Sequence, residues 1–161
     1  MEPQVFNFSD YAMDIATRLK DIKHSATSRH YIEVDSLDGL GSMSLSGAKD
    51  HPPFLVAVIN TDEVNSSEAT VRCFYTLIVL DKGTDDAKKK IAKGRCKRIA
   101  RKIKAKLKYD ADENLNGLHD LDVESISVSS LPAMGEYVGV MMSFYVGEAD
   151  VDEYDELDWM P

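Results

Sequence analysis

The chain has 161 residues and a formal net charge of −9 at pH 7, and a chain of this length can bury one hydrophobic core without disulfide or metal cross-links. It contains no apolar run near the roughly 18 residues that a membrane span requires, and its first residues lack the basic and apolar regions of a secretory signal. We therefore expect a soluble protein without a membrane partner, built as one domain over residues 1–147 with a C-terminal tail over residues 148–161.

Two cysteines are present, Cys73 in an apolar run typical of a strand and Cys96 in a run typical of a helix. Two cysteines in such positions do not form the regularly spaced set of a disulfide framework. We expect both to stay reduced and to pack in the core.

The first third of the chain predicts a helix, a short strand and a loop. Apolar residues recur at three- and four-residue steps over residues 12–22, and Ser9 or Asp10 can cap a helix that starts there. A short strand is expected over residues 31–34. The glycine-rich residues 38–47 that follow show little periodicity, so we expect them to form a mobile loop.

Four apolar or alternating runs predict longer strands. They cover residues 54–59, 70–80, 123–128 and 137–146, and they are rich in β-branched and aromatic residues. Hairpin-length connections join most of the neighbouring runs. Together with the helices, this order predicts an α+β fold with an antiparallel sheet of about five strands and two helices packed on one face.

The second helix is the most regular element. It is expected after a turn and cap at residues 81–85, and its interior Gly94 costs about 1 kcal/mol of helix propensity relative to alanine. Seven apolar residues recur along one stripe at helical spacing, and these are Ile91, Ala92, Cys96, Ile99, Ala100, Ile103 and Leu107.

Charge is strongly segregated along the chain. Residues 88–108 carry twelve of the nineteen basic residues and no acid, which leaves seven bases against twenty-eight acids elsewhere. Seven of these acids lie in residues 148–161, interleaved with apolar and aromatic residues and without a base. Twelve bases repel one another at i,i+4 spacing, so the helix requires a counter-charge.

Three sources of that counter-charge remain open: an acidic segment of the same or a neighbouring chain, the phosphates of a nucleic acid, or solvent. The segment has no aromatic residue for base stacking, so sequence-specific reading of a nucleic acid is disfavoured. The candidate contact residues are Lys97, Arg98, Arg101, Lys102 and Lys104 on the helix and Asp152, Glu153, Tyr154, Asp155 and Trp159 in the tail.

One segment has part of the pattern of a calcium-binding loop. Asp112, Asn114 and Asn116 supply oxygen at alternate positions, and Gly117 takes the place of the conserved turn glycine. The twelfth position is Val123, however, where a calcium loop needs a glutamate. We therefore favour an ordinary turn and expect neither a metal nor a cofactor.

No pattern of an enzyme stands out. The four histidines have no metal-ligand spacing, and the sequence has no nucleophile elbow, C-x-x-C pair or phosphate-binding glycine loop. A pair of catalytic carboxylates hidden among the many acids, as in a small hydrolase, is the one enzymatic alternative. We expect a protein that is not an enzyme.

The order of the predicted elements resembles the tail-terminator and tail-completion proteins of tailed bacteriophages, including those of head-to-tail connectors. The resemblance is architectural and covers most of the chain. It rests on the helix at residues 9–23, the hairpin at residues 54–60 and 70–80, the helix at residues 85–108, and the strand at residues 137–146 before the acidic end. The loop at residues 38–50 and the extended basic helix depart from it.

This resemblance implies a structural virion protein at the neck or tail, assembled in the host cytoplasm as a ring that is commonly a hexamer. Its partners would be copies of itself, other neck and tail proteins, and DNA in the lumen. The segregated charge suits a contact in which the acidic tail of one subunit meets the basic helix of the next. The alternative is an accessory protein that binds nucleic acid without sequence preference through helix 88–108.

Overall fold

The computed structural model describes residues 4–42, 52–67, 70–149 and 157. The described elements follow the predicted order of one helix, three strands, one helix and two strands, so the α+β fold is confirmed. They are α1 (Phe8–Arg18), β1 (Tyr31–Val34), the 3-10 helix η1 (Leu37–Ser42), β2 (Phe54–Ser67), β3 (Thr70–Lys82), α2 (Asp86–Asp112), the 3-10 helix η3 (Leu118–Asp120), β4 (Leu121–Ser130) and β5 (Tyr137–Ala149).

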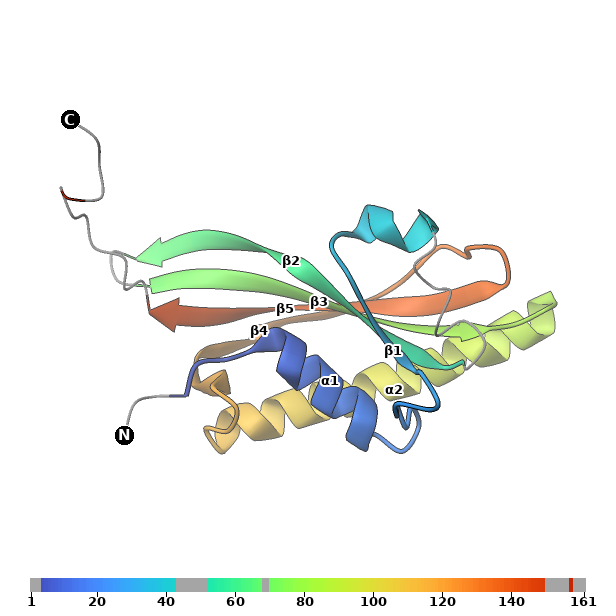
Figure 1. Cartoon of the computed structure of the whole chain (residues 1–161), viewed down its shortest axis with the longest axis horizontal. Coiled ribbons are helices and arrows are strands. Elements are labelled where there is room, and N and C mark those ends of the chain that lie inside the picture. Colours follow the sequence, from blue (N-terminus) through green and yellow to red (C-terminus); the bar gives the residue numbers. More distant parts are fainter. Residues whose placement is uncertain (1–3, 43–51, 68–69, 150–156, 158–161) are drawn as a thin grey trace.

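The five strands form one sheet in the order β1-β2-β3-β5-β4 (Figure 1). Three of the four neighbouring pairs are antiparallel, as expected. β1 pairs with β2 in parallel, however, from Tyr31 opposite Leu55 to Val34 opposite Val58. The sheet is therefore mixed, which corrects the expected antiparallel arrangement at this edge, because a long connection and not a hairpin joins β1 to β2.

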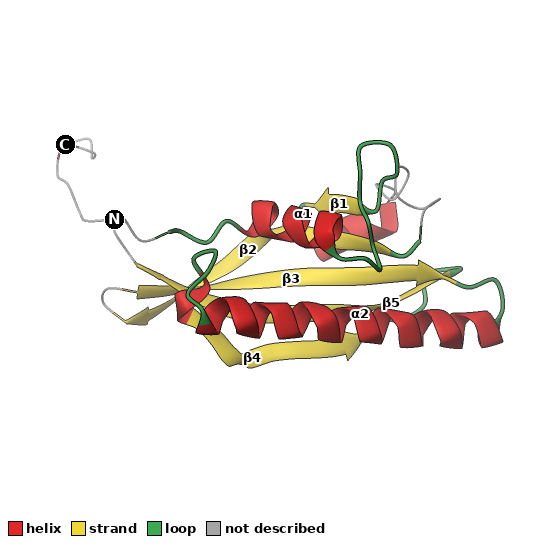
Figure 2. Cartoon of the chain, turned by 90° about the horizontal axis from the view of Figure 1, so that it is seen from below, coloured by secondary structure: helices red, strands yellow, loops and turns green. Residues whose placement is uncertain are grey.

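Both helices pack on the same face of the sheet, as the sequence predicted (Figure 2). α2 lies along β3 and β5, and α1 lies beside it over β2. Six of the seven predicted stripe residues of α2 are buried, but Ile91 is 61% exposed. Ile91 lies in the first turns of the helix, where its spacing from Ala92 directs it away from the sheet.

A second, smaller core lies on the opposite face of the sheet. Its members come from β1, β2 and β3, and Leu40 of η1 packs over them together with Leu131 and Met134 of the β4–β5 connection. The prediction of a mobile loop over residues 38–47 was therefore wrong for its first part, because burial of Leu40 gives η1 a reason to fold. Residues 43–47 lie outside the described part of the chain.

Two element boundaries differ from the predicted ones. α1 begins after Asn7, whose side chain accepts a hydrogen bond from the Asp10 N–H, so neither Ser9 nor Asp10 is the cap. α1 also ends at Arg18, although Ile22 is 2% exposed. The turn after the helix brings Ile22 back to the core, which extended the apparent periodicity beyond the helix.

β5 continues past the predicted domain boundary at residue 147. Gly147, Glu148 and Ala149 pair with the start of β3. The Glu148 carboxylate accepts a hydrogen bond from the Tyr75 hydroxyl at 2.8 Å, so this acid belongs to the sheet. The acidic tail therefore begins after Ala149 in structural terms.

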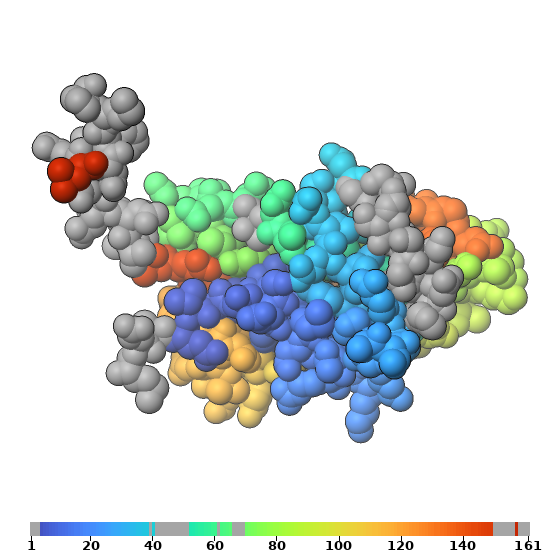
Figure 3. All heavy atoms as spheres, in the orientation of Figure 1, coloured from blue at the N-terminus to red at the C-terminus, as the bar shows by residue number. Residues whose placement is uncertain are grey.

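The buried carboxylate of Asp110 joins the two helices. It is 1% exposed and accepts hydrogen bonds from the Tyr11 hydroxyl at 2.7 Å, Lys106 Nζ at 2.8 Å and Asn116 Nδ2 at 3.2 Å. Burial, and then the nearby Asp110 carboxylate, raise the pKa of Tyr11, so its hydroxyl stays protonated as a donor. Figure 3 shows the N-terminal region in blue lying against the segment that ends α2.

Gly117 is required by the approach of the N-terminal segment. Its φ of 75° is left-handed, and a Cβ at this position would lie 2.5 Å from the Phe6 nitrogen. The missing side chain lets Phe6 enter the core, where its ring meets the rings of Tyr11 and Tyr75 edge-on.

We predict that Asp110→Ala lowers the free energy of unfolding by about 2–4 kcal/mol, because it leaves the half-buried Lys106 and the buried Tyr11 hydroxyl without their acceptor. The control Asp112→Ala removes an exposed carboxylate at the end of the same helix and should change the value by less than about 0.5 kcal/mol. Urea unfolding measures both. Equal effects would show that the Asp110 network does not hold the helices together.

Both cysteines should be unreactive in the folded chain. Cys73 and Cys96 are free and buried, and burial, with the nearby Asp81 carboxylate, raises the pKa of Cys96 to about 12. At pH 8 such a thiol carries on the order of a thousandfold less thiolate than an ordinary cysteine. A thiol reagent should therefore label neither residue before unfolding and both residues in denaturant, and rapid labelling of the native chain would contradict the packing.

Candidate interaction surface on the basic helix

The polar perimeter of α2 is divided into two flanks by the buried stripe that faces the sheet. Helical spacing of three and four residues places ten of the twelve bases of the segment on these flanks. The α1 flank comprises Lys88, Arg95, Lys102 and Lys106. The β4 flank comprises Lys90, Lys93, Lys97, Arg101, Lys104 and Lys108.

The α1 flank finds its counter-charges within the chain. Arg95 Nη1 lies 2.7 Å from the carboxylate of Asp81, which is 1% exposed, and Lys106 pairs with the buried Asp110. Lys102 pairs with Asp21 in the turn after α1, and Lys88 with the capping residue Asp85 at 3.8 Å. Each base on this flank therefore has an acidic partner in the same molecule.

The β4 flank has no such partners within residues 4–42, 52–67 and 70–149. None of its six bases forms an ion pair with a carboxylate in that part of the chain. They follow one another at three- and four-residue steps, so each lies next to a like charge. An anion from outside the described fold would relieve this repulsion.

A groove lies between this flank and the last strand of the sheet. Lys97, Arg101 and Lys104 line it on one side, and residues 128–130 of β4 with Val140 of β5 line it on the other, enclosing about 310 Å³. Figure 2 shows β4 running alongside α2. Because β4 is the outermost strand, its far edge has no neighbouring strand among the described residues.

The residues predicted from the sequence are only partly brought together. Lys97, Arg101 and Lys104 share the groove, whereas Lys102 lies on the α1 flank and pairs with Asp21. Arg98 is exposed between the two flanks. The predicted tail residues, Asp152, Glu153, Tyr154, Asp155 and Trp159, lie outside the described residues.

The contribution of β4 could not be found from the sequence. Val128 and Ser130 carry no charge and belong to no motif, and only the sheet order shows that they lie at an edge beside α2. The signal that was available is weak. Residues 127–130 are Ser-Val-Ser-Ser, so the end of this strand has only one apolar side chain that could be buried.

The calcium-like segment forms the end of α2 and the turn that follows. Asp112 is the last helical residue, and Asn114 and Asn116 adopt left-handed φ angles of 54° and 57°. The Asn116 amide donates to Asp110, so it serves the junction between the helices. Within the described part of the chain, no three histidine, cysteine or acidic residues group as metal ligands.

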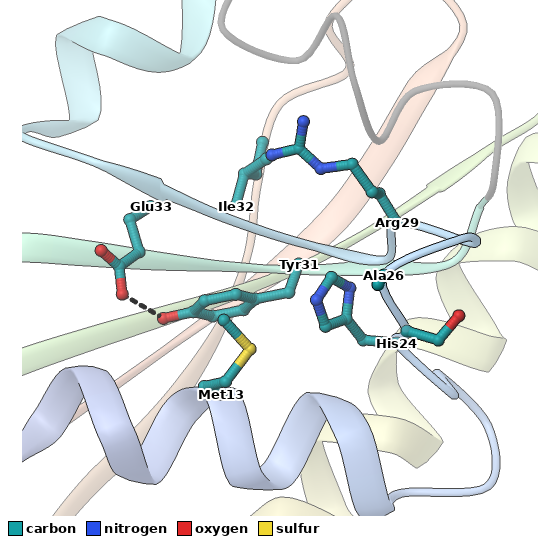
Figure 4. Close-up of a pocket in the computed structure, with 8 residues that line it drawn as sticks. Met13, His24, Ala26, Arg29, Tyr31, Ile32 and Glu33 are labelled. Atoms are coloured by element: carbon teal, nitrogen blue, oxygen red, sulfur yellow. Dashed lines mark hydrogen bonds between the residues drawn. The ribbon is translucent and has the colours of Figure 1, made fainter.

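A second hollow, of about 480 Å³, lies between α1 and β1 (Figure 4). The Tyr31 hydroxyl donates to Glu33 at 2.8 Å, and His24 Nδ1 accepts the His30 N–H at 3.0 Å. Burial raises the pKa of Tyr31 and lowers that of His24, so both are neutral at pH 7. The Ser9 hydroxyl of α1 also donates to Glu33, so this cluster connects β1 to α1.

Comparison of the chain with models of protein families and with curated proteins gave no match. Among the described helices, none combines the length and the apolar character that crossing a membrane would take.

The two flanks should respond oppositely to charge reversal. Lys97→Glu replaces two i,i+4 repulsions by attractions and should raise the free energy of unfolding by about 0.5–1 kcal/mol. Lys106→Glu places a carboxylate beside the buried Asp110 and should lower it by about 2 kcal/mol or more. Urea unfolding of dilute protein at low ionic strength measures both, and a loss in both variants would refute the division into flanks.

Proposed function

We propose that this protein is a structural subunit of a tailed-bacteriophage particle, without enzymatic activity, that assembles head to tail into a ring at the neck or tail end. The observation that carries the proposal is that the two flanks of α2 differ in how far their charges are neutralised. One flank is neutralised within the chain, whereas the six bases of the other have no acidic partner among the described residues, and three of them line a groove.

The matching negative charge is present in the same sequence. Residues 150–158 carry six acids and no base. Each copy thus offers one basic surface and one acidic segment, and a contact between these two unlike surfaces is heterologous. Repetition of such a contact closes into a ring when the rotation between neighbours permits, which supports a cyclic homo-oligomer.

The placement in a phage particle is supported by the order of the elements. An N-terminal helix, a long hairpin, a second helix and a final strand before an acidic end are the features that resemble tail-terminator and tail-completion proteins. The hairpin of β2 and β3 extends to Ser67 and Thr70, well beyond the short β1.

We predict that the full chain forms a discrete oligomer at about 50 mM salt that dissociates at about 1 M salt, where exposed charges are screened. Light scattering and electron microscopy measure the assembly. The triple variant Lys97→Glu, Arg101→Glu, Lys104→Glu should be monomeric while keeping the circular dichroism of the parent chain.

The matched control reverses three bases remote from the groove, Arg18, Lys20 and Lys23, and changes the net charge equally. It should assemble like the parent chain. If the groove variant also assembles like the parent, or if the parent is monomeric both alone and beside purified phage particles, the ring proposal fails. Tight DNA binding with a steep loss in rising salt, and no oligomer, would instead support the nucleic-acid alternative.

A further inference from the structure

The hydrogen-bonding phase of β4 shows which backbone groups face outward. The Leu131 N–H donates to the Gly139 carbonyl, and the Tyr145 N–H points to β4 and donates to Ser125. Alternate residues of an antiparallel strand bond to the same neighbour. Ser127 and Ser129 therefore bond inward to β5, and the backbone N–H and C=O groups of Val128 and Ser130 point away from the sheet.

The same two residues direct their side chains toward the helix. Val128 lies opposite Met142 and Ser130 opposite Val140, and both partners belong to the core beneath α2. Residues opposite each other in a sheet share a face. Val128 is nevertheless 40% exposed, because the groove leaves it uncovered. A strand added at this edge would thus have one face toward Lys97, Arg101 and Lys104.

The acidic segment has the periodicity that such a strand requires. Alternate residues of a strand lie on one face, about 6.8 Å apart. The even positions of residues 150–158 are Asp150, Asp152, Tyr154, Glu156 and Asp158, so four of five carry a carboxylate. The bases of the β4 flank follow each other at rises of about 4.5–6 Å along α2, which is close enough to the carboxylate spacing for two or three neighbouring carboxylates each to meet a base.

The copy that supplies the segment must be a different one. Ala149 ends β5 three positions beyond the pair of Leu121 and Val146. Val128 lies opposite Met142, seven residues before Ala149, so the chain's own tail would cross two strand spacings of about 4.8 Å each and then run back about 24 Å to reach Val128. That path uses about ten extended residues, so the acids would already have passed before the groove was reached.

From these observations we propose that residues 150–158 of a neighbouring copy enter the groove between α2 and β4 as a sixth strand. Backbone hydrogen bonds form with Val128 and Ser130, and the even-numbered carboxylates face Lys97, Arg101 and Lys104. This proposal rests on the head-to-tail assembly proposed above and specifies the form of its contact.

The test compares two substitutions at one position in the full chain. Val128→Pro removes only an outward N–H, which an edge strand tolerates, and it should weaken assembly about tenfold through the lost backbone bond and the bulk of the ring at the edge. Val128→Thr keeps the N–H with a side chain of similar shape and should stay within about threefold of the parent chain. Analytical ultracentrifugation gives both values.

A second pair of variants tests the strand periodicity with equal charge changes. Asp152→Lys with Glu156→Lys alters the face expected toward α2, and should abolish assembly. Glu153→Lys with Asp155→Lys alters the opposite face, and should retain a discrete oligomer. Equal loss in both pairs would show that the segment binds through its net charge and not as a strand.

Hydrogen exchange covers the case in which the proline variant does not fold. The amides of Val128 and Ser130 should exchange about tenfold more slowly in the assembled chain than in the monomeric Lys97→Glu, Arg101→Glu, Lys104→Glu variant. The Ser129 amide, already bonded to β5, should not change. If the assembled chain shows no protection at Val128 and Ser130, strand addition is wrong although the ring can stand.

Mixing two variants shows whether the segment in the groove comes from a neighbouring copy or from the same chain. The groove variant keeps a normal acidic segment, and the Asp152→Lys, Glu156→Lys variant keeps a normal groove. Together they should form dimers and nothing larger, because each pair makes one productive contact. If no dimers form, and assembly returns only when both sets of substitutions are in one chain, the segment binds the groove of its own chain. Assembly of the groove variant like the parent would refute the proposed function itself.

Discussion

The structure depends on how α2 accommodates twelve bases on a helix that must also bury an apolar stripe against the sheet. Like charges at helical spacing repel one another, so acids close to the helix stabilise it. Asp81 from β3 and Asp110 near the end of α2 do so from buried positions, each with a base at under 3 Å. These pairs secure one flank of the helix along most of its length, and the side toward β4 stays positive.

The fold was largely predictable because its elements are local patterns. The apolar stripe of α2 and the alternation in the long strands depend on spacing alone, and the order of elements follows from them. Pairing across the chain is a different matter. β1 has four residues, and nothing within Tyr31–Val34 distinguishes a parallel from an antiparallel partner. Ile22 likewise met the helical spacing although it lies in a turn.

The interaction surface was predicted in its charge but not in its shape. Composition places the bases in one segment, yet the division into two flanks depends on which acids the fold brings near, and Asp21 is remote from Lys102 in sequence. The groove also needs β4 at the edge, which follows from the position of β5 between β3 and β4. The sequence shows which residues are charged, whereas the tertiary structure determines which of them are paired.

Gly117 has a consequence for the orientation of any assembly. By admitting Phe6 against the backbone, it anchors the start of the described chain beside Gly147–Ala149, so both ends of the fold leave from one pole of the molecule. The opposite pole holds the β4–β5 turn and the beginning of α2 (Figure 1). Copies related by rotation alone keep this polarity. Any closed ring of this chain would thus have two chemically unlike sides.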